Sequence, residues 1–153
     1  MQPTAEAYEP RKPDIFLVTK AEKIVEKMMA EDKFSQWLGI ELKEIKEGFS
    51  KIEMNVRPEM INGHGVMHGG ISFSLADSAF AFACNTHGQK AVSIETSINH
   101  VKPVFAGDQL IATCEMESIS KSVGYYLTRV TRGNELVGLF KGVAYRKKEE
   151  WDI

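Results

Sequence analysis

The segment 69–87 constrains the fold most, because it predicts a helix that is apolar on nearly every side. It begins at a pair of glycines, and helical spacing distributes its apolar side chains around the helix. These are Ile71, Phe73, Leu75, Ala76, Ala79, Phe80, Ala81, Phe82 and Ala83. Such a helix must be buried on nearly all sides. A curved sheet wrapped around it would provide that burial, so we expect the strands before and after it to belong to one sheet.

Segments rich in β-branched and aromatic residues lie on both sides of this helix. Residues 40–56 predict an antiparallel hairpin that turns at Gly48 and ends at Pro58. After the helix, which Gly88 closes, we expect four further strands arranged as a meander. They are separated by turns at 107–108, 121–124 and 133–134. One antiparallel sheet with one dominant helix is an α+β fold.

The chain before the hairpin predicts an additional N-terminal helix that follows a loose arm. The arm contains three of the five prolines. Thr19, with Glu22 three positions later, forms a capping-box pattern, and Ile24 and Met28 recur at helical spacing. We therefore predict a flexible arm at 1–18, a single domain at 19–147 and a C-terminal tail at 148–153.

Length, charge and cysteine content exclude several classes of protein. A chain of 153 residues suits one domain, and its net charge of −2 gives no reason to expect nucleic acid or an acidic membrane as a partner. No apolar run approaches the roughly 20 residues that span a bilayer, and the first residues are too polar for a secretory signal. Two cysteines, Cys84 and Cys114, form no disulfide framework. We expect a cytoplasmic protein.

Asp77 is the most unusual residue of the apolar helix. With histidines neutral, it is the only formally charged side chain between Met60 and Gln89. Burying an unpaired carboxylate is costly, so either donors surround it or it lies at a wet cleft. Ser74 and Ser78 are the nearest donors in sequence, which keeps a structural role open beside a catalytic one.

The start of the same helix, in the segment HGVMHGG, is a candidate anion site. Gly69 and Gly70 leave the first helical N–H groups open, and these groups lack internal partners and lie at the positive end of the helix dipole. Such a terminus can stabilise a transient oxyanion. The glycines could equally serve a tight turn, and both interpretations can hold together.

Other catalytic motifs are absent from the sequence. It contains no GxGxxG, no phosphate-binding loop and no GxSxG elbow. His64 and His68 flank a glycine loop without an acidic residue between them, so we expect no metal site. Cys84 is expected to be a core residue, because nothing nearby in sequence would lower its pKa.

The run N-x-H-G-x-x-H-G-G-x-x-F-x-L-A-D-x-A, from Asn62 to Ala79, resembles the hotdog-fold acyl-CoA thioesterases of the PaaI-like (phenylacetic acid degradation) branch. The likeness extends through AVSIETSINHVKPVFAGDQLIATCE and covers about residues 35–147. It implies a hotdog fold, in which an antiparallel sheet wraps a long central helix. It also implies a homodimer with sheets joined edge to edge, paired again into a tetramer, and no cofactor beyond the CoA of the substrate.

The resemblance also assigns roles by position. Asp77 matches the carboxylate that acts as general base or nucleophile, and Gly69 matches the glycine whose N–H polarises the thioester carbonyl. Asn62 helps to position the thioester or water, His68 flanks it, and Ser93 lies near the attacking water. The family places Asn62 and Gly69 of one chain opposite Asp77 of the partner. Residues matched to substrate or CoA binding are Gly70, His64, Lys102, Pro103, Lys121 and Ser122.

The resemblance thus implies an acyl-CoA thioesterase, and its branch implies aryl- or medium-chain substrates of the phenylacetyl-CoA type. The alternative is a non-catalytic hotdog protein that binds acyl-CoA or a fatty ligand. A dehydratase of the same fold is a third possibility, which needs a catalytic histidine placed differently. Intact Asp77, Gly69 and Asn62 favour the enzyme. In the segment INHVKPV, His100 stands where relatives have an aromatic residue, so this position does not identify the acyl group.

Overall fold

The computed structural model describes residues 17–153, so the greater part of the predicted arm lies outside the described residues. Its helices are α1 (Lys20–Glu31), α2 (Lys33–Leu38), the short 3-10 helix η1 (Pro58–Met60) and α3 (Gly69–Asn85). Its strands are β1 (Glu41–Lys46), β2 (Phe49–Asn55), β3 (Gln89–His100), β4 (Gln109–Ile119), β5 (Val123–Arg132) and β6 (Glu135–Glu150). Within residues 17–153, no helix is both long and apolar enough to cross a bilayer.

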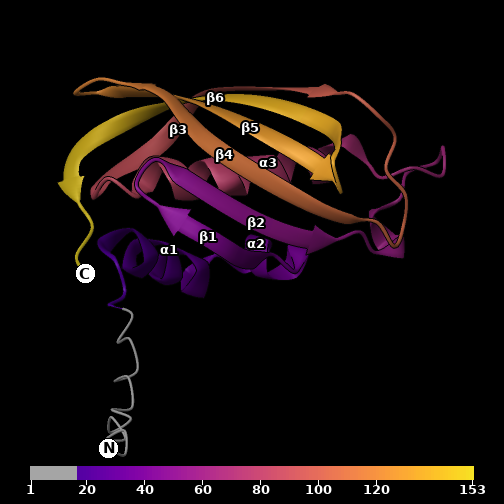
Figure 1. The fold of residues 1–153 in the computed structure, drawn as a ribbon, viewed down its shortest axis with the longest axis horizontal. Helices are drawn as coiled ribbons and strands as arrows, with labels where there is room; N and C mark the ends of the chain where they lie inside the picture. Colours follow the sequence, from indigo (N-terminus) through magenta and orange to yellow (C-terminus); the bar gives the residue numbers. More distant parts are fainter. Residues whose placement is uncertain (1–16) are drawn as a thin grey trace, which may run out of the picture.

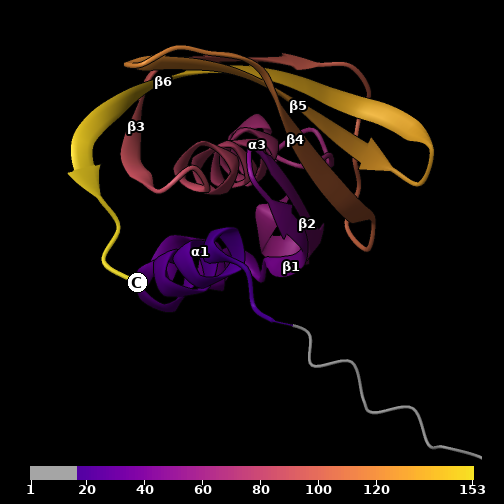
Figure 2. The same ribbon diagram turned by 60° about the vertical axis from the view of Figure 1, so that its left-hand side comes forward.

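The predicted hotdog fold is confirmed. Six antiparallel strands form one sheet in the order β1-β2-β4-β5-β6-β3, and the sheet curves over α3 (Figure 1). Figure 2 shows α3 inside this curve and α1 on the open side below it. The side chains of Leu75, Ala79 and Phe82 are fully buried. Most of the circumference of the helix is therefore covered, by the sheet and by α1 and α2, as its composition requires.

The four-stranded meander predicted after α3 is wrong in one respect. Strands β4, β5 and β6 do form a meander, but β3 pairs with β6, with Ile98 opposite Phe140. Strand β4 pairs instead with β2, where Ala112 lies opposite Ile52. The physical reason is the connection between β3 and β4, which at residues 101–108 is longer than most hairpin loops and crosses the sheet instead of turning. Strand β3 is therefore an edge strand.

The N-terminal helix forms with the predicted cap but is followed by a second helix. The Thr19 hydroxyl accepts from the Glu22 N–H at 3.2 Å, and the Glu22 carboxylate accepts from the Thr19 N–H at 2.7 Å. Asp32 then ends α1 and caps α2, because its Oδ1 accepts from the Ser35 N–H at 2.9 Å. Ile24 is fully buried against the domain and Met28 partly.

The C-terminal segment is part of the domain's hydrogen-bonded structure. Strand β6 continues to Glu150, which places residues 148–150 in the sheet and not in the predicted tail. The Trp151 N–H then donates to the Gly88 carbonyl at 2.8 Å. Helix α3 ends at Asn85, slightly before the predicted end, and Gly88 at φ +101° turns the chain into β3.

Candidate active site

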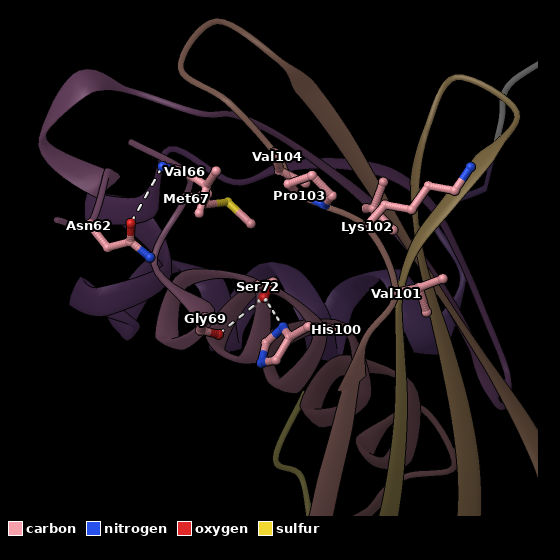
Figure 3. A pocket seen from close by; sticks show the side chains of 11 residues that line it. Asn62, Val66, Met67, Gly69, Ser72, His100, Val101, Lys102, Pro103 and Val104 are labelled. Carbon is pink, nitrogen blue, oxygen red and sulfur yellow. Dashed lines mark hydrogen bonds between the residues drawn. The ribbon is translucent and has the colours of Figure 1, made fainter. Parts of the chain in front are cut away.

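The loop before α3 is held by its first residue, Asn62. The Asn62 side-chain oxygen accepts from the His64 N–H at 2.8 Å and the Val66 N–H at 3.4 Å. Gly65 adopts a positive φ of +79°, which closes the turn. Figure 3 shows the side-chain oxygen of Asn62 facing Val66, with its amide nitrogen on the other side. The oxygen thus holds the loop, and the NH₂ group has no hydrogen-bond acceptor among the described residues.

The helix start presents one open N–H group. His68 is the N-cap, and its Nδ1 accepts from the Gly70 N–H at 2.9 Å. The Ile71 N–H donates to the His68 carbonyl at 2.9 Å. Within the part of the chain that the structure describes, the Gly69 N–H has no acceptor. The predicted oxyanion donor is therefore the N–H group that capping leaves free.

His100 lies directly against this helix start, although the sequence assigned it no role. Its Nδ1 lies 3.2 Å from the Ser72 hydroxyl, which donates to the Gly69 carbonyl at 3.0 Å. A Cβ placed on Gly69 would lie 3.0 Å from His100 Nε2. The residue at this position was noticed in sequence only as the replacement of an aromatic. Its pairing with Ser72 joins β3 to α3, which no local pattern shows.

These residues line a cavity of about 340 Å³, shown in Figure 3. The opposite wall is the loop that follows β3. The lining consists of Asn62, Val66, Met67, Gly69, Ser72, His100, Val101, Lys102, Pro103, Val104 and Val137. A volume of a few hundred Å³ is typical of small-molecule sites. Of the predicted residues, the structure brings Asn62, Gly69, Lys102 and Pro103 together here.

Two charged residues of that wall have partners of their own. Lys102 Nζ contacts the Glu135 carboxylate at 2.9 Å, so this predicted substrate- or CoA-binding residue already forms an ion pair. Asp108 accepts from the Phe105 N–H at 2.9 Å and from Arg132 at 2.8 Å. The Phe105 N–H, followed by the Arg132 hydrogen bond, lowers the pKa of Asp108. Asp108 therefore fixes the shape of the loop.

Asp77 lies in a second cavity, of about 350 Å³, between α3, β3, β6 and α1. Its lining is Met28, Asp77, Phe80, Ala81, Cys84, Asn85, Lys90, Ala91, Val92, Ser93, Lys147 and Trp151. Asp77 is half-buried. Burial, followed by the negative charge of Asp32, raises the pKa of Asp77 above its ordinary value. Ser93, the hydroxyl predicted near the attacking water, lines the same cavity.

The serines that flank Asp77 bond elsewhere. Ser74 donates to the Gly70 carbonyl at 2.7 Å, and the Ser78 hydroxyl lies 2.9 Å from that of Ser35. Ser35 in turn bonds Asp32 at 2.5 Å. Among the residues that the structure describes, no hydrogen bond or ion pair holds the Asp77 carboxylate. A purely structural role for Asp77 thus lacks the donors that it would need.

The two candidate halves do not meet within one chain. Gly69 and Asp77 are eight residues apart on α3, which is about 12 Å along the helix axis. They open into different cavities. A thioester carbonyl bound at Gly69 therefore lies beyond the reach of Asp77 in the same chain.

The remaining predicted residues lie elsewhere. His68 and Gly70 line a third cavity, with Phe34 and Trp37 of α2. His64 is exposed, and Lys121 and Ser122 lie exposed in the turn between β4 and β5, outside the three cavities described. Between residues 17 and 153, no group of three or more His, Cys, Asp and Glu side chains is arranged to hold a metal ion.

Fold and site together define a hotdog-fold protein with an unpaired carboxylate on its central helix. Residues 64–139 match the model of the thioesterase superfamily. The chain is 41% identical to the acyl-coenzyme A thioesterase PaaI of Escherichia coli K12 over 120 residues, 78% of this chain and 86% of that protein. It is 40% identical to an Archaeoglobus fulgidus protein named putative esterase, over 85% of each chain.

The solved structure of E. coli PaaI, from the phenylacetic acid degradation operon, superposes with a TM-score of 0.84 at 38% identity. That match covers 86% of this chain and 96% of that one. The chain therefore belongs to the thioesterase superfamily, within its PaaI-like branch, and by family it is a thioester hydrolase.

Proposed function

We propose that this protein hydrolyses acyl-CoA thioesters to a free acid and CoA, with Asp77 as the reacting carboxylate. One observation carries the proposal: Asp77 is half-buried in a cavity with a mostly apolar lining, and no donor or cation is bonded to it. A raised carboxylate pKa in a cleft is typical of groups that accept protons during catalysis. The resemblance to E. coli PaaI, which is named an acyl-coenzyme A thioesterase, supports the substrate class.

In the proposed reaction, the thioester carbonyl oxygen accepts a hydrogen bond from the free Gly69 N–H at the helix start. Asp77 either takes a proton from the attacking water or attacks the carbonyl carbon itself. In either route the C–S bond then breaks, and the thiolate of CoA leaves and takes up a proton. The first route releases the acid directly. In the second, water hydrolyses the anhydride formed between the acyl group and Asp77, which releases the acid and restores the carboxylate. The developing oxyanion is stabilised by the N–H and the positive end of the α3 dipole. In this proposal the Asn62 amide beside Gly69 orients the ester, and the Ser93 hydroxyl, which lines the cavity of Asp77, orients the water.

The separation of Gly69 from Asp77 supports an active site built from two subunits. Strand β3 is an edge of the sheet, and it exposes Val92 and Ile94 at 43% and 61% of their surfaces. A long exposed apolar edge is a template for pairing with another strand. We propose that two copies pair through β3, which brings Gly69 and Asn62 of one subunit towards Asp77 of its partner. A dimer of such dimers completes the proposed tetramer.

We further propose aryl- or medium-chain acyl groups of the phenylacetyl-CoA type, and a reaction without metal or prosthetic group, in which CoA enters as part of the substrate. Cys84 and Cys114 are buried and free, which supports a reducing compartment such as the cytoplasm.

A thiol-release assay over a panel of acyl-CoA substrates tests the proposal. The purified protein is expected to release CoA from phenylacetyl-CoA, octanoyl-CoA or both, and the Asp77→Asn variant is expected to lose that activity. Calorimetric binding of the same esters without release of thiol would refute hydrolysis and identify a binding protein of the same fold.

A further inference from the structure

The cavity beside Asp77 is a slot with a defined far end. It follows α3 from Asp77 to Asn85, eight residues and about 12 Å further along the helix. Strand β3 forms the facing wall, with Ser93 towards Asp77 and Ala91 hydrogen-bonded to Asn85. The apolar side chains of the lining are Met28, Phe80, Ala81, Cys84, Ala91 and Val92, and Lys90 and Lys147 complete it.

The far end is formed by Trp151, which is held in place from several sides. Its Nε1–H donates to the Asn85 side-chain oxygen at 2.9 Å, and its backbone N–H donates to the Gly88 carbonyl at 2.8 Å. Lys90 Nζ lies 5.5 Å from the centre of the indole ring. The next residue is fixed as well, because Lys27 Nζ donates to the Asp152 carbonyl at 2.6 Å.

Asn85 is itself rigidly bonded, which makes this wall firm. Its side-chain nitrogen donates to the carbonyls of Ala81 at 2.9 Å and Ala91 at 3.1 Å, and its oxygen accepts from the Ala91 N–H at 2.9 Å. It is 3% exposed. The indole is therefore fixed to the end of α3 and to the start of β3 at once.

We propose that Trp151 is a specificity-determining residue that limits the length of the acyl group. The proposal rests on the proposed function, since it takes the acyl chain to extend from the carbonyl at Asp77 into this slot. An extended carbon chain advances roughly 1.3 Å per bond, because three bonds separate Cα atoms 3.8 Å apart. A slot of about 12 Å then holds an acyl group of about ten carbons before its end meets the indole.

This wall is formed by the N-terminal helix and the C-terminal segment of the chain. The thioesterase superfamily model matches residues 64–139, so both Trp151 and Met28 of α1 lie outside it. Gly69 and Asp77 lie within the matched residues, while the C-terminal segment and α1 close the slot.

Substrate preference tests the proposal directly. The measured quantity is the ratio of kcat/KM for tetradecanoyl-CoA to that for octanoyl-CoA. Trp151→Ala is expected to raise this ratio about tenfold or more, the range found when a few methylenes are admitted to an apolar pocket. Trp151→Phe restores a ring and is expected to keep the wild-type ratio. Trp37→Phe is the matched control, since Trp37 is 51% exposed on α2. An unchanged ratio in folded Trp151→Ala would overturn the proposal.

A binding experiment separates this inference from hydrolysis. The chain has two tryptophans, so Trp37→Phe leaves Trp151 as the one indole fluorophore. Titration with octanoate is expected to change its emission saturably, while tetradecanoate is expected to bind much more weakly. Both results can be obtained even if no ester is hydrolysed. No response to octanoate, or equal affinity for both acids, contradicts the proposal that Trp151 limits the length of the acyl group. Neither result bears on a measured thioesterase activity.

Discussion

His100 Nε2 lies 3.0 Å from the position that a Cβ would take on Gly69, so the imidazole occupies the space beside the first residue of α3. The Ser72 hydroxyl, 3.2 Å from His100 Nδ1, holds the ring there. Gly69 therefore serves two needs at once: it leaves its N–H open, and it makes room for a side chain from β3.

This contact predicts a coupling between the two residues. Gly69→Ala would bring a methyl group against His100, which is tighter than ordinary van der Waals contact. We expect the substitution to lower the free energy of unfolding by about 1 kcal/mol in the wild-type background and by clearly less when His100 is alanine. Urea denaturation of the four proteins of this cycle measures the difference. Equal losses in both backgrounds would show that the ring is not packed against Gly69.

Asp77→Asn separates the catalytic interpretation of Asp77 from the structural one. The amide keeps the shape but cannot accept the proton, so turnover should fall by about 10²-fold or more. The melting temperature should hold or rise, because burial disfavours the charged form and the neutral amide removes that cost. Turnover and melting are measured on one sample. Near-wild-type turnover, or a lower melting temperature with normal turnover per folded molecule, would refute the catalytic role.

The raised pKa of Asp77 also predicts two dependences on pH. Because the ionised carboxylate is the reactive form, the acidic limb of the kcat/KM profile should lie above the ordinary range of an aspartate. Burial is the larger cause and the charge of Asp32 the second. Asp32→Asn should therefore move this limb to lower pH, while Glu31→Gln, beside it on an exposed site, should not. If the acidic limb of folded Asp32→Asn does not move, the charge of Asp32 does not raise the pKa of Asp77.

The raised pKa of Asp77 makes the free energy of unfolding depend on pH, with the opposite sign from that of a carboxylate in an ion pair. With its folded pKa above its unfolded pKa, Asp77 binds more protons in the native state between the two values. Its contribution is most favourable below the unfolded pKa, and stability is lost as pH rises through the folded pKa. Asp77→Asn should thus gain stability relative to wild type as pH rises through this window, which urea denaturation at a series of pH values measures.

Local patterns predicted most of the fold. The apolar circumference of α3, the turn at Gly48 and the capping box at Thr19 all depend on residues near one another in sequence, and all three appear in the structure. The position of β3 could not be found in this way. Its partner strand β6 is the third strand after it in the chain, so its pairing depends on contacts between distant segments.

The same limit applies to the site. Asp77 stands out in sequence because one charge interrupts an apolar helix. Trp151 and His100 do not stand out, because their contacts are with residues distant in sequence. Trp151 bonds Asn85, 66 residues earlier, and His100 bonds Ser72, 28 residues earlier. The start of the second helix, α2, could have been predicted from the sequence, because aspartate is a preferred N-cap residue and Asp32 caps this helix.

The cysteine thiols are expected to be unreactive in the native protein. Burial raises the pKa of Cys114 to about 12 and that of Cys84 further, and both side chains are buried. Since the thiolate is the reactive form, iodoacetamide at neutral pH should modify neither residue and should leave turnover unchanged. Mass spectrometry with and without denaturant measures the labelling. Rapid native labelling of Cys84 with loss of activity would instead indicate a thiol nucleophile.

Complementation between two inactive variants tests whether each active site uses two subunits. Asp77→Asn removes the carboxylate. Gly69→Pro removes the open N–H, and proline is tolerated at this first helical position; His100→Ala in the same chain makes room for its ring. Each variant alone should be nearly inactive. In a hybrid dimer, however, Asp77 of the proline variant faces Gly69 of the asparagine variant, which restores one of two sites. Random pairing of equal amounts makes half the dimers hybrid, so co-refolding should recover about a quarter of wild-type activity.

The control mixes Asp77→Asn with a chain that carries all three substitutions, where no hybrid has an intact site and no recovery is expected. If the first mixture recovers no activity although mass spectrometry shows hybrid dimers, Gly69 of one subunit and Asp77 of its partner do not belong to one active site.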